Sequence, residues 1–357
     1  MKKTLAALLS AILLTASLCG CHNEVSETGA ERFPDFSVGL AVGQGGVEDG
    51  SFNQSAYDAI LEFQRQTGSS YTYTEAPKDE LSYDAISSLA KEEAYNVVWC
   101  MGETMQEPLL KATADFPNQL FAIIDAQVEK DKIPKNLIVV NIAAEESSLL
   151  SGYIAGQTTK TNSLGFVKGM ECPSNDAFEA GFRAGAYIAQ KELSKKIDVH
   201  KICIDTFKDM EAAKLATEKL IDSFNTDIVH QCAGKAGLGA IEKCREAGIY
   251  AIGVDRDQSS VAPETVLTSS VKHVGSAIYE ISGRIAKGEI SGGENIVLRM
   301  DTGHTGIGAT SDQTVPPEIL HNVKIIEDKI KSRAVIAPSN ENELNEFKSF
   351  VDKYFEK

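Results

Sequence analysis

Two aspartates stand where an apolar segment of strand length ends. Asp125 closes the run FAIID, and Asp255 closes the run AIGVD. In an open α/β sheet, ligands bind beyond the carboxyl ends of the strands, so a carboxylate at that position more often points into the ligand crevice than away from it. An ionised carboxylate only accepts hydrogen bonds and could hold both hydroxyls of a sugar such as ribose. The alternative is that either aspartate caps the next helix.

A glycine-rich loop precedes the first amphipathic segment, and Gly43–Ile60 reads GQGGVEDGSFNQSAYDAI. Gly43 and Gly45 match the first two glycines of the dinucleotide fingerprint, but the third position is Glu48. Asp49 follows, so a phosphate at the start of the next helix would meet two negative charges. The chain also lacks a G-x-x-x-x-G-K-[ST] loop. The sequence therefore predicts that this loop does not cradle a phosphate.

The first helix is expected to begin beside these glycines. Ser51 and Gln54 have the spacing of a capping box, with the serine as N-cap. Phe52 and Asn53 lie between them and combine an aromatic plane with an amide that both donates and accepts. This combination suits a heterocyclic ring. The alternative is a core phenylalanine followed by an ordinary helix-start asparagine.

Continuous apolar runs alternate with amphipathic segments along most of the chain. Such alternation is typical of parallel sheets covered by helices on both faces. The expected strands are 36–42, 96–101, 120–126, 137–142, 164–167, 199–204, 228–232 and 250–254, with later candidates at 266–271 and 295–300. The expected helices are 52–68, 81–94, 107–115, 145–158, 174–193, 210–224, 238–247 and 272–287. The sequence thus predicts an α/β fold.

The alternation restarts near residue 143, which indicates two similar lobes. The chain is too long for one small core, and no Pro, Gly or Ser-rich linker separates the two series. We expect residues 36–142 with 266–295 to form the first lobe, and residues 143–265 with 296–357 to form the second. The late segments would cross back through a hinge, and a ligand would bind between the lobes.

The first twenty residues, MKKTLAALLSAILLTASLCG, resemble a secretory signal peptide with a basic start and a short apolar region. They end in LCGC, which resembles a lipobox and makes Cys21 the expected lipidation site. Residues 21–35 would then form a polar tether between a lipid anchor and the globular body. The alternative is an ordinary signal peptide that contains cysteine. No other window is apolar over eighteen residues.

Composition argues against several classes of function. The chain has a formal net charge of −16, or −18 without Lys2 and Lys3, so nucleic acid is a poor partner. The cysteines lack the paired spacing of a zinc site, and Cys100, Cys203 and Cys232 are expected as buried free thiols. The histidines are scattered, and no G-x-S-x-G elbow or nucleophile–base pair occurs. We therefore expect no enzyme activity, no metal and no cofactor.

Seven ordered motifs give the chain a close resemblance to the basic membrane protein family. They are GGVEDGSFNQSAY, FAIIDA, FEAGFRAGA, DTFKD, CAGKAGLGAIEKC, IGVDRDQ and LTSSVK. These PnrA-like lipoproteins are substrate-binding components of ABC transporters, mostly for purine nucleosides. The resemblance implies a type I periplasmic-binding-protein fold, with two Rossmann-like lobes joined by a multi-crossover hinge. It also implies a small-molecule ligand, an ABC permease partner, and a lipid-anchored, extracytoplasmic position at the cell membrane.

The resemblance adds roles for individual residues. It implies that Phe52 and Asn53 face the base, and that Phe178 and Phe207 close over the base or sugar. For the latter two, the alternative is helix packing on the sheet. It also implies that Lys272 reaches the sugar.

Lys272 follows the run VLTSSV, and the resemblance implies that it lies near Asp125 or Asp255. There one cation could keep two carboxylates ionised. Gly234 ends the run IVHQCAG, where backbone groups could contact the sugar. The alternative for Lys272 is a solvated surface lysine. The alternative for Gly234 is an ordinary turn glycine.

Gly43 is where the chain departs from this family, because nucleoside binders in the family typically have an aspartate at that position. Glycine removes an acceptor for a purine edge and opens space. Our leading hypothesis is a lipid-anchored binding protein that captures a nucleoside, with purine preferred, for uptake by a permease. A second hypothesis is a binder of riboflavin or another bulky heterocycle. A third is a surface receptor or adhesin, which the anchor alone motivates.

Overall fold

The computed structural model describes residues 31–91 and 94–355. The expected signal peptide, the lipidation site Cys21 and residues 21–30 of the expected tether lie outside the described residues. Within them, no helix is long and apolar enough to cross a membrane. The described residues from Arg32 onward form one compact unit built around two sheets.

The first sheet has six strands in the order β11-β5-β4-β3-β1-β2, and all neighbours pair in parallel. Its strands are β1 (Ser37–Val42), β2 (Ser70–Glu75), β3 (Val97–Met101), β4 (Phe121–Ile124), β5 (Leu137–Ile142) and β11 (Glu294–Leu298). β3 is buried throughout, as its apolar run requires. The hydrophobic pattern does not predict β2. This is the edge strand, its residues are largely exposed, and its polar sequence SYTYTE has no apolar run.

The second sheet repeats this arrangement in the order β12-β10-β9-β8-β6-β7. Its strands are β6 (Ser163–Lys168), β7 (Asp198–Cys203), β8 (Ile228–Cys232), β9 (Tyr250–Asp255), β10 (Val266–Lys272) and β12 (Thr305–Ile307). Only the short strand β12 runs antiparallel, against β10. In both sheets the first strand lies between the second and the third, which creates a topological switch point for ligand binding.

The expected domain boundaries are wrong at the two late strands. β10 belongs to the second sheet, because it pairs with β9 and β12. β11 belongs to the first sheet, because it pairs with β5. The chain therefore changes lobe after Lys272, and it changes back after Leu298. Order along the chain could not show this, because a strand that follows β9 can join either sheet.

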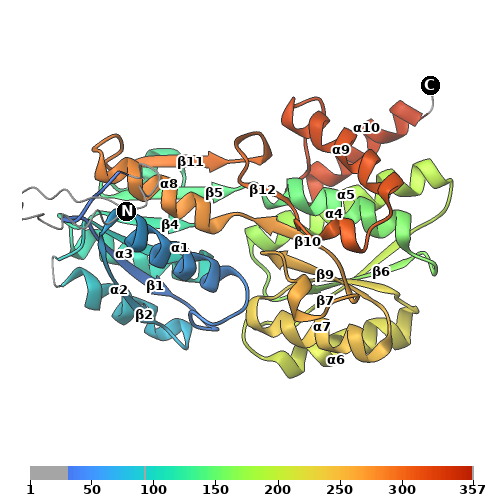
Figure 1. Ribbon diagram of the computed structural model, residues 1–357, viewed down its shortest axis with the longest axis horizontal. Coiled ribbons are helices and arrows are strands. Elements are labelled where there is room, and N and C mark those ends of the chain that lie inside the picture. Colours follow the sequence, from blue (N-terminus) through green and yellow to red (C-terminus); the bar gives the residue numbers. More distant parts are fainter. Residues whose placement is uncertain (1–30, 92–93, 356–357) are drawn as a thin grey trace, which may run out of the picture. The chain divides into compact units, whose positions relative to one another are not determined.

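Helices cover both faces of the first sheet, as Figure 1 shows. They are α1 (Phe52–Thr67), α2 (Ser82–Ala90), α3 (Gln106–Asp115) and α8 (Val274–Ala286). α1 and α8 pack side by side and share one apolar core with the sheet. α2 and α3 share a second core with the opposite face. Together with the first sheet they form the first lobe.

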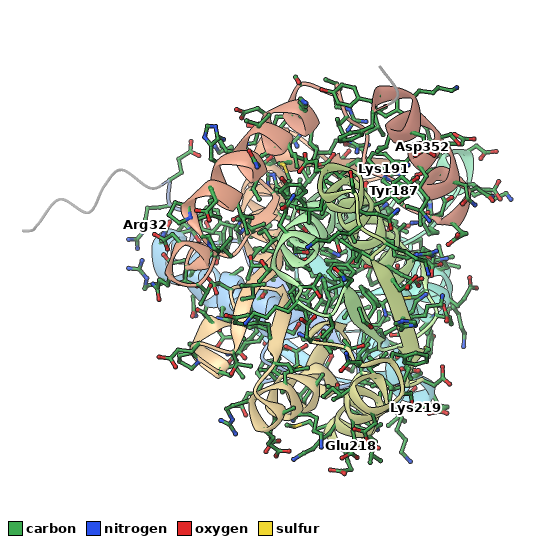
Figure 2. All side chains as sticks on the ribbon, turned by 90° about the vertical axis from the view of Figure 1, so that its right-hand side faces the viewer. Arg32, Tyr187, Lys191, Glu218, Lys219 and Asp352 are labelled. Carbon is green, nitrogen blue, oxygen red and sulfur yellow. The ribbon has the colours of Figure 1, made fainter. Side chains whose placement is uncertain are left out.

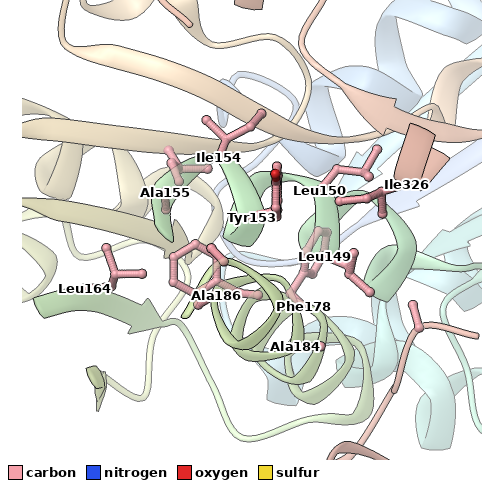
Figure 3. Packing of buried hydrophobic residues seen from close by; sticks show 14 of the residues in the cluster. Leu149, Leu150, Tyr153, Ile154, Ala155, Leu164, Phe178, Ala184, Ala186 and Ile326 are labelled. Carbon is pink, nitrogen blue, oxygen red and sulfur yellow. The ribbon is translucent and has the colours of Figure 1, made fainter. Parts of the chain in front are cut away.

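The second lobe is built in the same way. Its helices are α4 (Ala144–Thr158), α5 (Pro173–Leu193), α6 (Met210–Phe224), α7 (Gly237–Ala247), α9 (Pro317–Lys331) and α10 (Glu341–Phe355). α6 and α7 cover one face of the sheet, and α4, α5, α9 and α10 lie in a cluster on the other. Figure 3 shows part of that cluster, in which Leu149 of α4 and Phe178 of α5 are buried. Neither α9 nor α10 is among the helices expected from the sequence.

α4 and α5 approach each other more closely than side chains would allow. A Cβ atom on Gly152 would lie 2.0 Å from the carbonyl oxygen of Phe182, and one on Gly185 would lie 1.9 Å from that of Leu149. The contact is therefore backbone against backbone, which only glycine permits. This contact holds α5, whose first turn reaches the ligand cleft.

α10 is attached to α5 by polar contacts at the surface. The Tyr187 hydroxyl donates to Asp352 Oδ1 at 2.6 Å, and Lys191 forms an ion pair with the same carboxylate. Figure 2 shows the three side chains together where the two helices meet.

Within the described residues, the chain passes between the lobes at three places. β5 ends at Ile142 and leads to α4, β10 ends at Lys272 and leads to α8, and β11 ends at Leu298 and leads to the second lobe. The Ala143 amide donates to the Leu298 carbonyl oxygen at 2.9 Å, which ties two of the crossings together. These three crossings form a hinge of the type used in domain closure.

The expected free thiols are only partly confirmed. Cys100 and Cys232 are buried, as expected, and both are free. Cys203 is also free but only half-buried, so the expectation of burial is wrong there. The reason is that β7, which ends at Cys203, is the edge strand of the second sheet.

Candidate functional site

A cleft is lined by residues from both lobes. The eight ligand-binding candidates from the sequence all line it: Phe52, Asn53, Asp125, Phe178, Phe207, Gly234, Asp255 and Lys272. Many of the lining residues follow the carboxyl ends of strands, where parallel sheets place their ligands.

Asp125 and Asp255 occupy matching positions in the two lobes. Each follows or ends the fourth strand of its sheet, and each has a left-handed backbone, with φ of 60° and 65° respectively. Aspartate is among the few residue types that adopt this conformation readily, and such backbones often mark functional sites. Both side chains are buried.

Lys272 ends β10 and supplies the cation of the cleft. Its side chain is 1 % exposed, and its ammonium forms an ion pair with Asp125 Oδ2. Burial alone would lower the pKa of Lys272, but the carboxylates of Asp125 and Asp255 outweigh it and raise that pKa. The lysine is therefore charged, and it contacts a carboxylate of the opposite lobe.

Ser174, in the first turn of α5, adds neutral contacts to this charged group. Its hydroxyl donates to Asp125 Oδ2 at 3.3 Å and lies 3.5 Å from Lys272 Nζ. Its backbone amide donates to Glu103 Oε1 at 2.8 Å. Glu103 follows β3 in the first lobe, so these contacts join the two lobes at the cleft.

The start of α1 differs from the expected capping box. Ser51 precedes the helix but makes no side-chain cap, and the Gln54 side chain accepts from the Gly50 amide instead. Asp49 is the actual capping group, because its carboxylate accepts from the amides of Ser51, Asn53 and Gln54 at 2.8–3.0 Å. The capping-box prediction is therefore wrong. The cause is tertiary: the serine hydroxyl is used elsewhere.

That hydroxyl connects the lobes. Ser51 Oγ donates to Asp255 Oδ2 at 2.5 Å. Burial raises the pKa of Asp255 to about 6, although Lys272 and this hydrogen bond oppose the rise. Asp255 is thus held by one donor from the first lobe and faces the Lys272 ammonium from its own lobe.

Several carboxylate oxygens remain without a donor. Among the described residues, none donates a hydrogen bond to Asp125 Oδ1 or Asp255 Oδ1, and no other residue donates to Glu103 Oε2. These residues line the cleft, so their oxygens can accept hydrogen bonds from a ligand that presents donors there. Neighbouring hydroxyl groups are such donors.

Aromatic rings lie beside these acceptors. Phe52 begins α1 in the first lobe, while Phe178 lies on α5 and Phe207 follows β7 in the second lobe. Lys272 Nζ lies 5.1 Å from the ring centroid of Phe52 and 5.7 Å from that of Phe178. The cleft therefore offers flat apolar faces close to its charged end, which suits a ring joined to a polar group.

Asn53 and Gly43 also line the cleft. Asn53 is buried and donates through Nδ2 to the Gln44 carbonyl oxygen at 3.2 Å, and no described residue donates to its Oδ1. A Cβ atom on Gly43 would meet Thr104 Oγ1 at 3.5 Å and no other atom within 4 Å. The glycine therefore leaves space, and the Thr104 hydroxyl is the polar group nearest to it.

Gly234 begins the turn after β8. Its φ is +54°, and a Cβ atom there would lie 3.3 Å from the carbonyl oxygen of Phe207. Glycine avoids both the strain and the close contact, which keeps the Phe207 segment against the turn.

Sequence reasoning missed Glu103, Thr104, Cys172, Ser174 and Asn175, all of which line the cleft. Glu103 follows the apolar run NVVWCM, so the strand-end argument that identifies the aspartates would have found it. Ser174 carries no such signal, because its place depends on how α5 packs. No group of three or more His, Cys, Asp or Glu among the described residues could hold a metal ion.

The fold and this inter-lobe cleft define a class of protein. A solved solute-binding protein of an ABC transporter system from Aeropyrum pernix K1 superposes with a TM-score of 0.79 at 19 % identity, over 89 % of this chain and 98 % of that chain. At that identity the likeness shows the fold alone. The chain therefore has the periplasmic-binding-protein fold of ABC solute-binding proteins.

Sequence comparison identifies the family. The model of the Bmp family, described as ABC transporter substrate-binding protein PnrA-like, matches residues 36–341. Basic membrane protein A of Borreliella burgdorferi is 32 % identical over 86 % of this chain and 89 % of its own. A Lactococcus lactis protein named ABC transporter nucleoside-binding protein BmpA is 27 % identical over 87 % of this chain and 93 % of its own. The chain belongs to the Bmp family of PnrA-like ABC transporter substrate-binding proteins.

Proposed function

We propose that this protein binds a nucleoside, with purine preferred, in the inter-lobe cleft and delivers it to an ABC permease for uptake. The observation that carries the proposal is the combination of groups that line the cleft. Aromatic faces and the Asn53 amide lie beside carboxylates that surround Lys272. A nucleoside matches both kinds of group, with a flat base and a hydroxyl-rich sugar. The name of the Lactococcus lactis relative supports this ligand class.

The proposed recognition follows from these groups. Phe52 and Phe207 stack on the base, and Asn53 hydrogen-bonds its edge through the free Oδ1. Asp125 and Asp255 accept hydrogen bonds from the sugar hydroxyls through their free oxygens, and Lys272 keeps Asp125 oriented. Because the groups come from both lobes, a ligand that satisfies them all stabilises the closed arrangement.

The open space at Gly43 supports a second candidate, a larger heterocycle such as riboflavin. Only the Thr104 hydroxyl lies near the position where a side chain would begin. A wider ring system could occupy that space. Its ribityl chain would present several hydroxyls to the same carboxylates.

We further propose that the protein is lipid-anchored through Cys21 on the extracytoplasmic side of the cell membrane. This proposal rests on the sequence LCGC and on the family. Replacing Cys21 with serine should release the protein from membranes into the soluble fraction. Retention of the C21S protein in washed membranes would contradict the anchor.

A thermal-shift screen tests the ligand class. Adenosine, guanosine, inosine, cytidine, uridine and riboflavin are added separately, each at a concentration far above its expected dissociation constant. A ligand at about 100 times its dissociation constant adds about 2.7 kcal/mol to the free energy of unfolding, which raises the melting temperature measurably. The nucleoside proposal predicts the largest shift for a purine nucleoside. If no nucleoside shifts the melting temperature, it is wrong, and a shift with riboflavin alone would favour the second candidate.

A further inference from the structure

Glu103 gives the cleft more negative charge than one lysine can balance. The carboxylates of Asp125 and Asp255 already face the Lys272 ammonium, and Asp125 forms an ion pair with it. Glu103 lines the same cleft and is close enough to Asp125 and Lys272 to interact with both electrostatically. Among the described residues that line the cleft, Lys272 is the only cation.

The side chain of Glu103 is held in a defined position. Its Oε1 accepts from the Ser174 amide at 2.8 Å, in the first turn of a helix of 21 residues. A carboxylate at a helix N-terminus is stabilised by the helix dipole and by free amides. The same serine contacts Asp125 and Lys272 through its hydroxyl. Glu103 is therefore fixed beside the group proposed to bind the sugar, and its Oε2 remains without a donor from any other described residue.

We propose that Glu103 is a specificity-determining residue, which selects ligands with an unphosphorylated sugar and rejects the corresponding phosphate esters. This inference rests on the proposed function, because it concerns the same ligand and the same cleft.

Electrostatic repulsion explains why the free sugar should bind more tightly than its phosphate ester. A phosphate monoester carries a charge of about −1.5 to −2 at pH 7 and presents acceptor oxygens. Like charges in a partly buried site repel, by about 2 kcal/mol for unit charges some 7–8 Å apart at an effective dielectric constant near 20. A sugar hydroxyl instead donates to a carboxylate oxygen. One residue thus adds both an attraction for the free sugar and a repulsion for its phosphate ester.

The ionisation of Glu103 makes this selectivity depend on pH. Burial, together with the charge of Asp125, raises its pKa to about 7, and Lys272 and the Ser174 amide only partly oppose this. The groups that face it are Asp125 after β4, Lys272 on β10, and the segment with Cys172 and Ser174 at the start of α5. We therefore expect rejection of phosphate esters to strengthen between pH 6 and pH 8.

Calorimetric titration of the mature chain tests the inference. Guanosine, inosine and adenosine are each compared with their 5′-monophosphates at pH 6 and pH 8. The variants are Glu103→Gln, which keeps an oxygen for the Ser174 amide, and Glu103→Ala. Glu107→Gln is the matched control, because Glu107 is exposed on α3 and does not line the cleft.

The wild-type protein should prefer the nucleoside at both pH values. In Glu103→Gln the ratio of nucleoside to nucleotide affinity should fall at pH 8 by about tenfold or more, equivalent to 1.4 kcal/mol. The fall should be smaller at pH 6, where the wild-type carboxyl is largely protonated. The phosphate also gains negative charge over this range, which strengthens its repulsion from the Glu103 carboxylate in the wild type and therefore acts in the same direction. Glu107→Gln should match the wild type.

Two results would overturn the inference. If nucleosides bind but the affinity ratio is the same in wild type, Glu103→Gln and Glu103→Ala, then Glu103 does not set specificity and the proposed function stands. If no nucleoside binds the wild-type protein, the proposed function fails and the inference fails with it.

Discussion

The ammonium of Lys272, at the end of β10 in the second sheet, forms an ion pair with Asp125 Oδ2, which follows β4 in the first sheet. Both side chains are buried, and the pair joins the lobes directly at the cleft. It occupies one oxygen of Asp125 and leaves the other free for a ligand. The pair therefore orients a carboxylate of the cleft and links the two lobes at the same time.

Replacing Lys272 with methionine should lower stability and weaken nucleoside binding. The variant keeps the approximate length of the side chain but leaves the carboxyl groups of Glu103, Asp125 and Asp255 without a cation. Removing one partner of a buried pair typically lowers the free energy of unfolding by about 3–5 kcal/mol, so the melting temperature should fall. The affinity should fall by at least about 10-fold, because Asp125 loses the partner that orients it and a hydrogen bond to a charged group contributes about 1.5–3 kcal/mol. Calorimetric titration measures the affinity. Lys214→Met, on the surface of α6, is the control and should bind normally. Wild-type affinity in K272M would contradict the role assigned to the pair.

The two aspartates should tolerate asparagine structurally but lose affinity. Asparagine also adopts the left-handed backbone of Asp125 and Asp255, so both variants should fold. Hydrogen bonds to charged groups contribute about 1.5–3 kcal/mol, so each change should weaken nucleoside binding by about 10–100-fold. The loss of affinity should be smaller for a 2′-deoxy or 3′-deoxy nucleoside, if that nucleoside lacks the sugar hydroxyl that the replaced aspartate binds. Asp222→Asn, on the exposed surface of α6, should have no effect. Equal losses for ribosides and both deoxyribosides would argue against contact with the sugar hydroxyls.

The positions of the two strand-end aspartates could be predicted because they depend on local sequence. An apolar run followed by an acid identifies the end of a buried strand, and all such ends in one parallel sheet meet at one edge. Asp125 and Asp255 can therefore be placed at the cleft from the sequence alone. Glu103 follows the apolar run NVVWCM and could be placed at the same edge in the same way.

Other features depend on contacts between distant segments and could not be read from local sequence. The sequence of β10, VLTSSVK, carries no signal for one sheet or the other, so only its pairing with β9 and β12 assigns it to the second lobe. Ser51 has the spacing of a capping residue, but its hydroxyl contacts Asp255, which is 204 residues away. Ser174 reaches the cleft because glycines on α4 and α5 allow the two helices to pack closely.

The observed cap of α1 leads to a prediction on stability. Asp49→Ala removes an acceptor for three backbone amides and should lower the free energy of unfolding by about 1–2 kcal/mol. Ser51→Ala should leave the helix cap intact. It should instead reduce nucleoside affinity, because Asp255 loses the donor that holds its Oδ2. Urea unfolding of the ligand-free variants measures stability, and calorimetric titration measures affinity. If S51A binds nucleosides as tightly as the wild type, the hydrogen bond to Asp255 does not organise the ligand site.

The ligand-free protein should become less stable as the pH rises from about 4 to 7. Burial raises the pKa of Asp255 from 3.8 to about 6 and that of Glu103 from 4.5 to about 7. The folded state therefore binds these protons more tightly than the unfolded state. The resulting stabilisation is present below the unfolded pKa values and is lost as the pH passes through the folded ones.

Glu103→Gln removes one of these groups. Its melting temperature should fall less between pH 5 and pH 8 than that of the wild type, by about 2 °C or more. Glu107→Gln should keep the wild-type pH dependence. Identical slopes in all three proteins would show that Glu103 titrates in the folded state as it does in the unfolded chain.

Removing the aromatic rings that line the cleft should weaken binding of the base. Phe52 and Phe207 come from opposite lobes, and each is only partly buried, so each ring has a face available to a ligand. Leucine in either position keeps an apolar side chain but removes the flat face. Stacking of a base on an aromatic ring contributes about 1–3 kcal/mol, so F52L and F207L should each weaken purine nucleoside binding by about 10–100-fold. A pyrimidine nucleoside, with its smaller ring, should lose less.

The matched control is Phe224→Leu, because Phe224 is an exposed phenylalanine at the end of α6, away from the cleft. Its affinity should equal that of the wild type. Melting temperatures of the ligand-free variants show whether the fold is retained, since Phe52 also packs against the core of the first lobe. F52L and F207L could be stable and still bind purine nucleosides as tightly as F224L. In that case the base does not stack on Phe52 and Phe207, and the proposed placement of the ligand is wrong.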